Sequence, residues 1–338
     1  MDLPAQVLDT ARLRLRPVAA ADEGAVVAAL NDLDVAGWLA VVPFPYRATD
    51  FRQFQTGYAV PGQTYAVEDA GGLVGILGVE DRTLGYWLAP AAQGKGYATE
   101  AARAALSSHF AADPSDIASG YFEGNARSAR VLEKLGFVEV GRHPKFCRAL
   151  GRERPHVEMR LSLAQFAAAW PVEARSARLS YRPLQPHDVH GLHRLVSQWE
   201  VVRQLGPSWP HPAEMAFTLT RARPFAGAGF HWGIFRDGAF IGTVGVTEGE
   251  LGYMIDPALH RQGFAREACG AALDRAFADG LDQVSAGVWA DNAASLALLD
   301  GLGFLRVGES LGPSRSRGGE HPGHDLVLKR TAWEARQG

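Results

Sequence analysis

The sequence repeats itself at an offset of 167 residues, and this duplication constrains the fold more than any other feature of the chain. In the longest matching block, 11 of 22 positions are identical. The matching blocks are 85–106 with 252–273, 125–137 with 292–304 and, at an offset of 166, 12–17 with 178–183. Solenoid repeats have periods of about 20–50 residues, so a period this long indicates two whole domains.

The length of the chain agrees with two domains. Its 338 residues give each half enough chain for a hydrophobic core of its own, at roughly 100–200 residues per domain. We expect the boundary close to residues 167–171, just before the second Arg-Leu-x-x-Arg-Pro segment. The predicted domains are residues 1–168 and 169–338.

Charge and composition exclude several classes of protein. The net charge of −3 lacks the basic surplus of a protein held to nucleic acid by phosphate contacts. Cys147 and Cys269 lie too far apart for a zinc motif, and two cysteines are too few for a disulfide scaffold. The first residues do not resemble a signal peptide, and no apolar run reaches the roughly 18 residues that span a membrane. We therefore expect a soluble, cytoplasmic protein that binds neither nucleic acid nor membranes.

Each half alternates strand-like and helix-like segments. Period-2 apolar patterns predict strands, and long runs of helix formers predict helices. In the first half we expect strands at 12–16, 65–68, 73–79 and 83–88, and helices at 22–30, 98–110 and 127–135, with Gly136 as a C-terminal cap. In the second half we expect strands at 230–235, 239–246 and 251–255, and helices from 265 and 294. The fold class is a mixed α/β fold, with helices on a mixed sheet, present twice.

A glycine-containing loop joins the last of these strands to the long helix in each half, at residues 93–98 and 260–265. Small residues allow a tight turn whose backbone N–H groups point at one place at the helix N-terminus, which suits a pyrophosphate. An ordinary strand–helix loop explains either segment taken alone equally well. Neither loop matches GxxxxGK[ST] or GxGxxG, so a P-loop and a dinucleotide-binding loop are excluded.

Several motifs occur in the same order in both halves. They are a Gly-Tyr-(Trp/Met)-(Leu/Ile)-x-Pro strand, a Gln/Arg-x-x-Gly-x-Gly/Ala-type loop, Glu100 or Glu267 followed by alanine, Asn-x-x-Ser and Leu-Gly-Phe. This combination resembles the GNAT acetyltransferase superfamily, and most closely its RimJ/RimL branch, which acetylates protein N-terminal amines. The resemblance covers nearly the whole chain, once per half. His260 departs from the usual Gln or Arg at the first loop position.

The resemblance implies a sheet that opens between its fourth and fifth strands and binds acetyl-CoA there, up to one molecule per domain, without a metal. In the first half the implied cofactor-binding residues are Trp87, Leu88, Ala89, Gln93, Gly94, Lys95, Gly96, Tyr97, Ala98 and Asn125. In the second half they are Met254, Ile255, Asp256, His260, Arg261, Gln262, Gly263, Phe264, Ala265 and Asn292. Asn and Ser before an apolar run are also common helix caps, so a purely local role is an alternative for the Asn-x-x-Ser segments.

Acetyl transfer to an amine needs a base or a held water, and an acid for the departing thiolate. Glu250 is the candidate base of the second half, on the same face as Glu248, and Asp81 is the weaker candidate of the first half. The family's tyrosine acid falls on Leu132 and Leu299, so the Asn-x-x-Ser branch implies Ser128 and Ser295 instead. Near the end of each half the family has an Asp, for which Asp325 fits and the first half offers His156.

The function that the resemblance implies is N-acetylation of a primary amine, on a small molecule or a protein N-terminus. The alternative is a CoA-binding sensor or scaffold without turnover, in which one or both domains are degenerate. Two fused domains are expected to act as a monomeric pseudo-dimer or to form a homodimer. The histidines at 187, 190 and 193 lack a cysteine or carboxylate partner in the sequence pattern, so we expect no metal site there.

Overall fold

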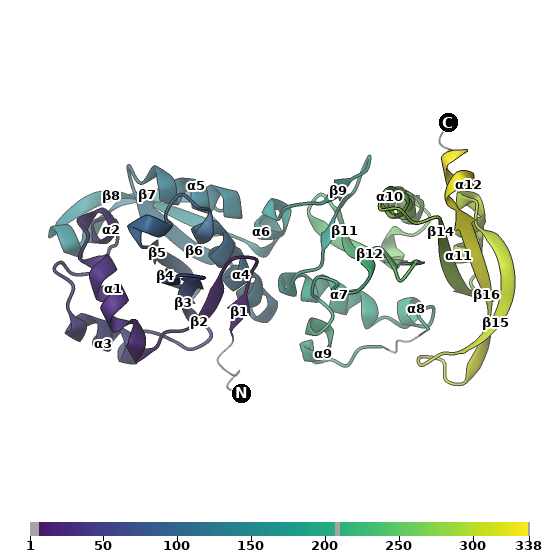
Figure 1. Cartoon of the computed structure of the whole chain (residues 1–338), viewed down its shortest axis with the longest axis horizontal. Coiled ribbons are helices and arrows are strands. Elements are labelled where there is room, and N and C mark those ends of the chain that lie inside the picture. Colours follow the sequence, from purple (N-terminus) through teal and green to yellow (C-terminus); the bar gives the residue numbers. More distant parts are fainter. Residues whose placement is uncertain (1–6, 207–209, 337–338) are drawn as a thin grey trace. The chain divides into compact units, whose positions relative to one another are not determined.

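The computed structural model describes residues 7–206 and 210–336 (Figure 1). The chain divides into two compact units between Trp170 and Pro171. Each unit contains one eight-stranded mixed sheet with helices packed on it, which confirms the predicted α/β fold and its duplication.

The first sheet has the strand order β1-β2-β3-β4-β5-β6-β8-β7. Its strands are β1 (Leu8–Asp9), β2 (Arg14–Pro17), β3 (Thr64–Asp69), β4 (Gly72–Glu80), β5 (Thr83–Leu88), β6 (Ile117–Phe122), β7 (Val138–Cys147) and β8 (Arg152–Leu161). The helices are α1 (Glu23–Leu30), α2 (Leu33–Ala36), α3 (Ala48–Gly57), α4 (Tyr97–Ala112), α5 (Ala126–Leu135) and α6 (Leu163–Ala169), with short 3₁₀ turns η1 (Ala20–Asp22), η2 (Pro90–Ala92) and η3 (Arg148–Leu150).

The second sheet repeats this order as β9-β10-β11-β12-β13-β14-β16-β15. Its strands are β9 (Ala174–Arg175), β10 (Ser180–Pro183), β11 (Gly229–Arg236), β12 (Ala239–Thr247), β13 (Glu250–Ile255), β14 (Gln283–Trp289), β15 (Leu305–Pro313) and β16 (Glu320–Lys329). The helices are α7 (Val189–Val196), α8 (Trp199–Val202), α9 (Ala216–Leu219), α10 (Phe264–Ala278), α11 (Ala293–Leu302) and α12 (Arg330–Glu334), with 3₁₀ turns η4 (Pro186–Asp188) and η5 (Pro257–Leu259).

The strands alternate between two apolar layers, as their period-2 patterns predict. Tyr65 and Leu77 join the core under α4 and α5, whereas Ala66 and Ile76 join a smaller core under α1–α3. The second unit has its own large core beneath α10 and α11. No helix within the described ranges is long and apolar enough to span a membrane.

Each sheet opens between two neighbouring parallel strands. β5 and β6 share the single register pair Thr83–Ala118, and β13 and β14 share only Glu250–Ser285. All other neighbouring strands are antiparallel and pair over longer stretches. If the two-residue strands β1 and β9 are left out, the opening lies between the fourth and fifth strands, as the family resemblance implies.

The Leu-Gly-Phe segments close α5 and α11. Gly136 and Gly303 have φ angles of 94° and 97°, and the N–H of the following phenylalanine bonds back to a leucine carbonyl of the last turn (3.1 and 3.0 Å). This pattern is the Schellman C-cap, which needs a left-handed residue that glycine adopts without strain. The predicted cap at Gly136 is therefore confirmed.

We predict that Gly136→Ala destabilises the protein more than Gly303→Ala. Both changes force alanine into a left-handed conformation, at about 1–2 kcal/mol. At Gly136 the new Cβ would also lie 2.7 Å from the backbone oxygen of Gln165, whereas at Gly303 it meets only the flexible side chain of Arg336, at 3.1 Å. Urea unfolding of the two variants measures the difference, and an equal loss would contradict the proposed role of the Gln165 contact.

Candidate functional site

A cleft of about 1500 Å³ follows the opening between β5 and β6. The starts of α4 and α5 form one part of its wall, and the β7–β8 hairpin and α2 form another. Among the predicted site residues it is lined by Asp81, Trp87, Leu88, Gln93, Gly94, Gly96, Tyr97, Ala98, Asn125 and Ser128. The structure therefore brings most of the first half's predicted residues together around one cavity.

The two glycine loops have the same backbone shape although their sequences differ. Gly94 and Gly96 have φ angles of 79° and 83°, and the equivalent residues Arg261 and Gly263 have 60° and 82°. Gly96 and Gly263 are the N-caps of α4 and α10, and no side chain caps either helix. The first-turn amides of both helices are thus uncapped donors at a positive helix end, as an anion site requires.

His260 performs the structural role of the glutamine that it replaces. In the first unit the Gln93 Nε2 donates to the carbonyl of Leu88 (3.0 Å), and Arg127 donates to the Gln93 Oε1 (2.6 Å). In the second unit Nε2 of His260 bonds to the carbonyl of Ile255 at the same distance. The departure from the family pattern therefore preserves the tie between the loop and the strand before it.

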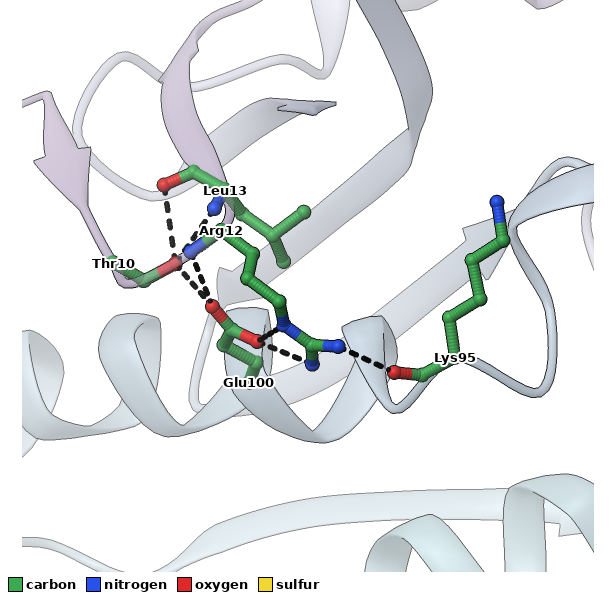
Figure 2. Close-up of polar contacts among 5 residues, drawn as sticks. All are labelled: Thr10, Arg12, Leu13, Lys95 and Glu100. Atoms are coloured by element: carbon green, nitrogen blue, oxygen red, sulfur yellow. Dashed lines mark hydrogen bonds and ion pairs between the residues drawn. The ribbon is translucent and has the colours of Figure 1, made fainter. Parts of the chain in front are cut away.

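A partly buried carboxylate anchors each loop, and sequence reasoning missed this contact. Glu100 Oε1 accepts from the hydroxyl of Thr10 (2.7 Å) and the backbone N–H of Arg12 (3.0 Å). Its Oε2 accepts from Nε and Nη2 of Arg12 (2.8 and 2.6 Å), while Nη1 of Arg12 donates to the carbonyl of Lys95 (2.9 Å). Figure 2 shows how this single guanidinium joins the long helix to the loop.

The second unit repeats the anchor with a serine in place of the threonine. Glu267 accepts from Ser176, from the backbone of Arg178 and from Nε of Arg178 (2.6–2.7 Å), and Nη1 of Arg178 donates to the carbonyl of Gln262 (3.0 Å). Arg12 and Glu100 belong to blocks that the repeat preserves, and this joint preservation was the available signal for their pairing. The arginines also lie over the rings of Tyr97 and Phe264 (4.9 and 4.3 Å).

The asparagines of the Asn-x-x-Ser segments are helix caps. The Oδ1 of Asn125 accepts from the backbone N–H of Ser128, and that of Asn292 accepts from Ser295, both at 3.1 Å. The asparagines therefore have the helix-capping role that was the alternative for these segments, and the caps do not use the serine hydroxyls.

A partly buried tyrosine lies beside Ser128, and Tyr253 stands at the equivalent position of the second unit. The Oη of Tyr86, on β5, lies 2.9 Å from the Oγ of Ser128, within hydrogen-bond distance. Burial raises the pKa of Tyr86 to about 12, against the opposing effect of Ser128. Burial likewise raises the pKa of Tyr253 in the second unit, where Ser295 opposes the shift. These tyrosines come from the Gly-Tyr strand motif, not from the position where the family has its tyrosine acid.

The carboxylates predicted as bases lie at the closed end of the openings. Glu250 is the first residue of β13, and its Oε1 is 3.3 Å from where a Cβ would stand on Gly287 of β14. Asp81 lies in the two-residue turn before β5, with φ 46°. Glu248 lies in the matching turn of the second unit, with φ 52°, so the expectation that it alternates with Glu250 along one strand face is wrong.

The strand register corrects one correspondence drawn from the sequence. Asp325 pairs with Gly287, and the equivalent pair in the first unit is Glu158 with Gly120. The counterpart of Asp325 is therefore Glu158, not His156, and both units have a carboxylate at this place. Glu158 lines the cleft and lies 4.0 Å from Nδ1 of His143.

The sequence indicates no role for His156 beyond standing where the family has an Asp. In the structure, His156 forms part of the cleft wall. It is buried, and its ring lies against Gly120, where a Cβ would be 2.4 Å from its Cε1. Burial lowers its pKa to about 4, and the nearby Lys145 and His143 act in the same direction. A neutral imidazole therefore faces the cleft at physiological pH.

Comparison with known proteins identifies the fold that carries this site. The family profile described as acetyltransferase (GNAT) domain matches residues 12–138 and again residues 178–305. The chain belongs to the GNAT acetyltransferase family. Each unit is thus one GNAT domain, and the chain is an N-acetyltransferase with two of them.

The chain is also similar to one further N-acetyltransferase and to solved structures of acetyltransferases. The N-acetyltransferase YoaA of Bacillus subtilis is 32% identical over 146 residues, which cover 39% of this chain and 81% of that protein. Among solved structures, a spermidine N-acetyltransferase from Vibrio cholerae in complex with CoA and spermine is 19% identical, and the match covers 47% of this chain and 99% of that one, with a TM-score of 0.42. RimJ of Mycobacterium smegmatis in complex with CoA-disulfide is 23% identical, covering 47% and 88%, with a TM-score of 0.41.

The anchors of the two GNAT domains respond to acid. Burial favours the neutral form of Glu100, but the bonds from Thr10 and Arg12 outweigh this effect and lower its pKa. The bonds from Ser176 and Arg178 do the same for Glu267. A carboxylate whose pKa is lowered by folding contributes stability above its unfolded pKa, about 4.3, and that stability is lost as the pH falls through the lower folded value.

We therefore predict that Glu100→Gln and Glu267→Gln reduce the free energy of unfolding at pH 7 and weaken its dependence on acid. Glutamine fits the space but cannot titrate. Urea unfolding of wild type and the double variant at pH 7, 4 and 3 measures this effect. If the variant loses as much stability between pH 7 and pH 3 as wild type, other carboxylates determine the acid response.

Proposed function

We propose that both GNAT domains bind acetyl-CoA and transfer its acetyl group to a primary amine, on a small molecule or a protein N-terminus. The observation that carries this proposal is the duplicated geometry: each domain joins an uncapped helix start to a sheet opening, and in the first domain Tyr86 also bonds Ser128. The two cysteines, Cys147 and Cys269, are buried free thiols, which suits the reducing cytoplasm as the site of action.

The residues around each opening suit the separate parts of acetyl-CoA. The loop amides at 94–98 and 261–265 would hold the pyrophosphate, since helix N-termini and left-handed turns bind anions. The backbone of Trp87–Ala89 and of Met254–Asp256 would bond the pantetheine, because strands that pair at one position leave the rest of their facing edges open. Bound acetyl-CoA would supply an activated acyl group with a thiolate as leaving group.

The protein's own side chains supply the proton chemistry. An amine must be neutral to attack, and in this proposal Asp81 or Glu250, at the closed end of the opening, holds a water or accepts the proton. The hydroxyl of Ser128, bonded to Tyr86, is the proton donor of the first domain, and the hydroxyl of Ser295 is that of the second. Tyr86 can return a proton to Ser128, so this pair acts as a short relay.

We predict that isothermal titration calorimetry gives two acetyl-CoA sites per chain. Gly96→Asp should abolish one site and Gly263→Asp the other, because each places a negative charge where a pyrophosphate is expected. Gly96→Ala and Gly263→Ala are the controls, since they impose similar left-handed strain without the charge. One site per chain in wild type would show that one loop is only structural.

We further predict that Ser128→Ala and Ser295→Ala each lower the turnover of their own domain by about 10²–10⁴-fold, the contribution of a general acid. Each is measured in a background where the other domain is silenced by the loop variant above. Because Asn125 and Asn292 form the caps, these serine variants should keep their melting temperature. The contrasting control, Asn125→Ala, should cost about 1 kcal/mol of stability.

Normal turnover in the double serine variant would exclude serine as the acid. If the protein binds acetyl-CoA but releases no CoA with any amine, the alternative of a CoA-binding sensor without turnover would be favoured.

A further inference from the structure

Arg317 lies in the turn that connects β15 and β16 of the second domain, and it is held over the end of β14. Its guanidinium lies 5.0 Å from the ring centre of Trp289. Its Nη1 donates to the carboxylate of Asp291 (2.7 Å), and its side chain is only 13% exposed. The turn itself is tied down, since Ser316 donates to the carbonyl of Val202 (3.1 Å). The guanidinium is therefore fixed in place.

One edge of this guanidinium has no acceptor. Nε and Nη2 are both buried and make no hydrogen bond to any described residue. These two nitrogens form the edge that binds a carboxylate side-on: Arg142 presents the same pair to the two oxygens of Glu139, at 2.7 and 3.0 Å. Buried donors in proteins are nearly always paired, and a side-on arginine edge matches the two oxygens of a carboxylate. The edge therefore has the geometry of a carboxylate-binding site.

The position of this edge relates it to the acetyl-transfer site. Trp289 and Gly287 lie on the same face of β14, two residues apart, which is about 7 Å along a strand. Glu250 lies against Gly287, and the cap residue Asn292 follows Trp289 by three positions. In the first domain the residue equivalent to Trp289 is Phe122, which lines the cleft. An acceptor whose amine lies near Glu250 can thus extend toward Arg317.

The first domain does not offer the same edge. There the arginine over Phe122 is Arg154, which comes from β8, lies between Phe122 and Trp38 (5.0 and 4.3 Å), and donates to the carbonyl of Gly37. Its cleft wall presents Glu158 and His156, where the second domain has Asp325 and Gly323. The two domains therefore differ in the side chains around Phe122 and Trp289.

We propose that the second domain acetylates amines that carry a carboxylate, and that Nε and Nη2 of Arg317 bind this carboxylate side-on. The inference rests on the proposed function and adds the class of acceptor. Both nitrogens are closed to solvent, so the carboxylate reaches them only when the atoms that cover this edge move aside. The carboxylate is either that of a free amino acid or that of an acidic side chain at a peptide N-terminus.

Matched pairs of amines test the proposal in the full-length chain. The first pair is alanine and alaninamide. The second pair is a peptide that begins with Asp and the same peptide with Asn at that position. The measured quantity is the ratio of kcat/KM within each pair, in a Gly96→Asp background. We expect wild type to prefer the carboxylate member of at least one pair, and Arg317→Gln to lower that preference by about 10–100-fold, the range of a charge-assisted hydrogen bond. The pair that responds identifies the source of the carboxylate.

Two further variants separate recognition from charge and folding. Arg315→Gln removes the same charge from the same turn, at an exposed side chain, and should keep the preference. Arg317→Lys keeps the charge but loses the side-on edge, and should lose most of the preference. Equal use of both members of each pair by wild type would overturn the proposal. So would an Arg317→Gln variant that keeps the preference, or one that slows both members equally.

A binding measurement keeps the two hypotheses separate. With CoA present, N-acetylalanine should raise the melting temperature of wild type more than N-acetylalaninamide does, and Arg317→Gln should remove the difference. If no amine is acetylated but this difference persists, the proposed acetyl transfer fails and the carboxylate site stands. If amines are acetylated without any carboxylate preference and the difference is absent, the site fails and the acetyl transfer stands.

Discussion

The carboxylate at the start of the long helix is the contact on which both domains depend. Glu100 and Glu267 each bond the first segment of their domain through an arginine, and that same arginine bonds the loop carbonyl two residues before the helix begins. A loop that must present bare amides cannot be stabilised by a side-chain cap, because a cap would occupy those amides. The arginine of the ion pair instead fixes the loop through one of its carbonyls, which leaves the amides without a side-chain partner.

The sheet opening depends on this arrangement. β5 leaves β6 after one register pair, so the strand edge inside the opening has no strand partner along most of its length. The backbone N–H and C=O groups along such an edge are costly when they are buried without a partner. The loop at its end is held by Gln93 and by the arginine of the anchor, and in the second domain by His260 and Arg178. The side chains that hold the loop in place therefore lie outside the opening itself.

Local patterns in the sequence predicted much of the fold and part of the site. The repeat, the glycine loops and the Leu-Gly-Phe caps are contiguous segments whose chemistry is local, and the structure places them where the sequence indicates. The pairing of Arg12 with Glu100 joins segments 88 residues apart, and no local pattern specifies it. The long hairpins β7–β8 and β15–β16 were likewise missed, since their exposed strands lack a clear apolar alternation.

The wrong correspondence between His156 and Asp325 has a specific cause. His156 and Glu158 are two residues apart on β8, so they lie on the same face of the strand. A two-residue slip leaves every side chain on its original face, and the apolar alternation of the strand is unchanged by it. The repeat offset of 167 residues, extended beyond the last matching block, places Glu158 opposite Asp325, and the pairing of β8 with β6 confirms this register.

The duplicated cores have a consequence for how the two halves can diverge. Each domain buries its own apolar layers, so its stability does not require matching substitutions in the other. The loop keeps its left-handed backbone with either Gly94 or Arg261 at the same place, and the arginine over Phe122 comes from β8 whereas the arginine over Trp289 comes from the β15–β16 turn. A chain with two such domains can keep the same glycine loop and sheet opening in both. Each domain can meanwhile evolve under selection for a different acceptor.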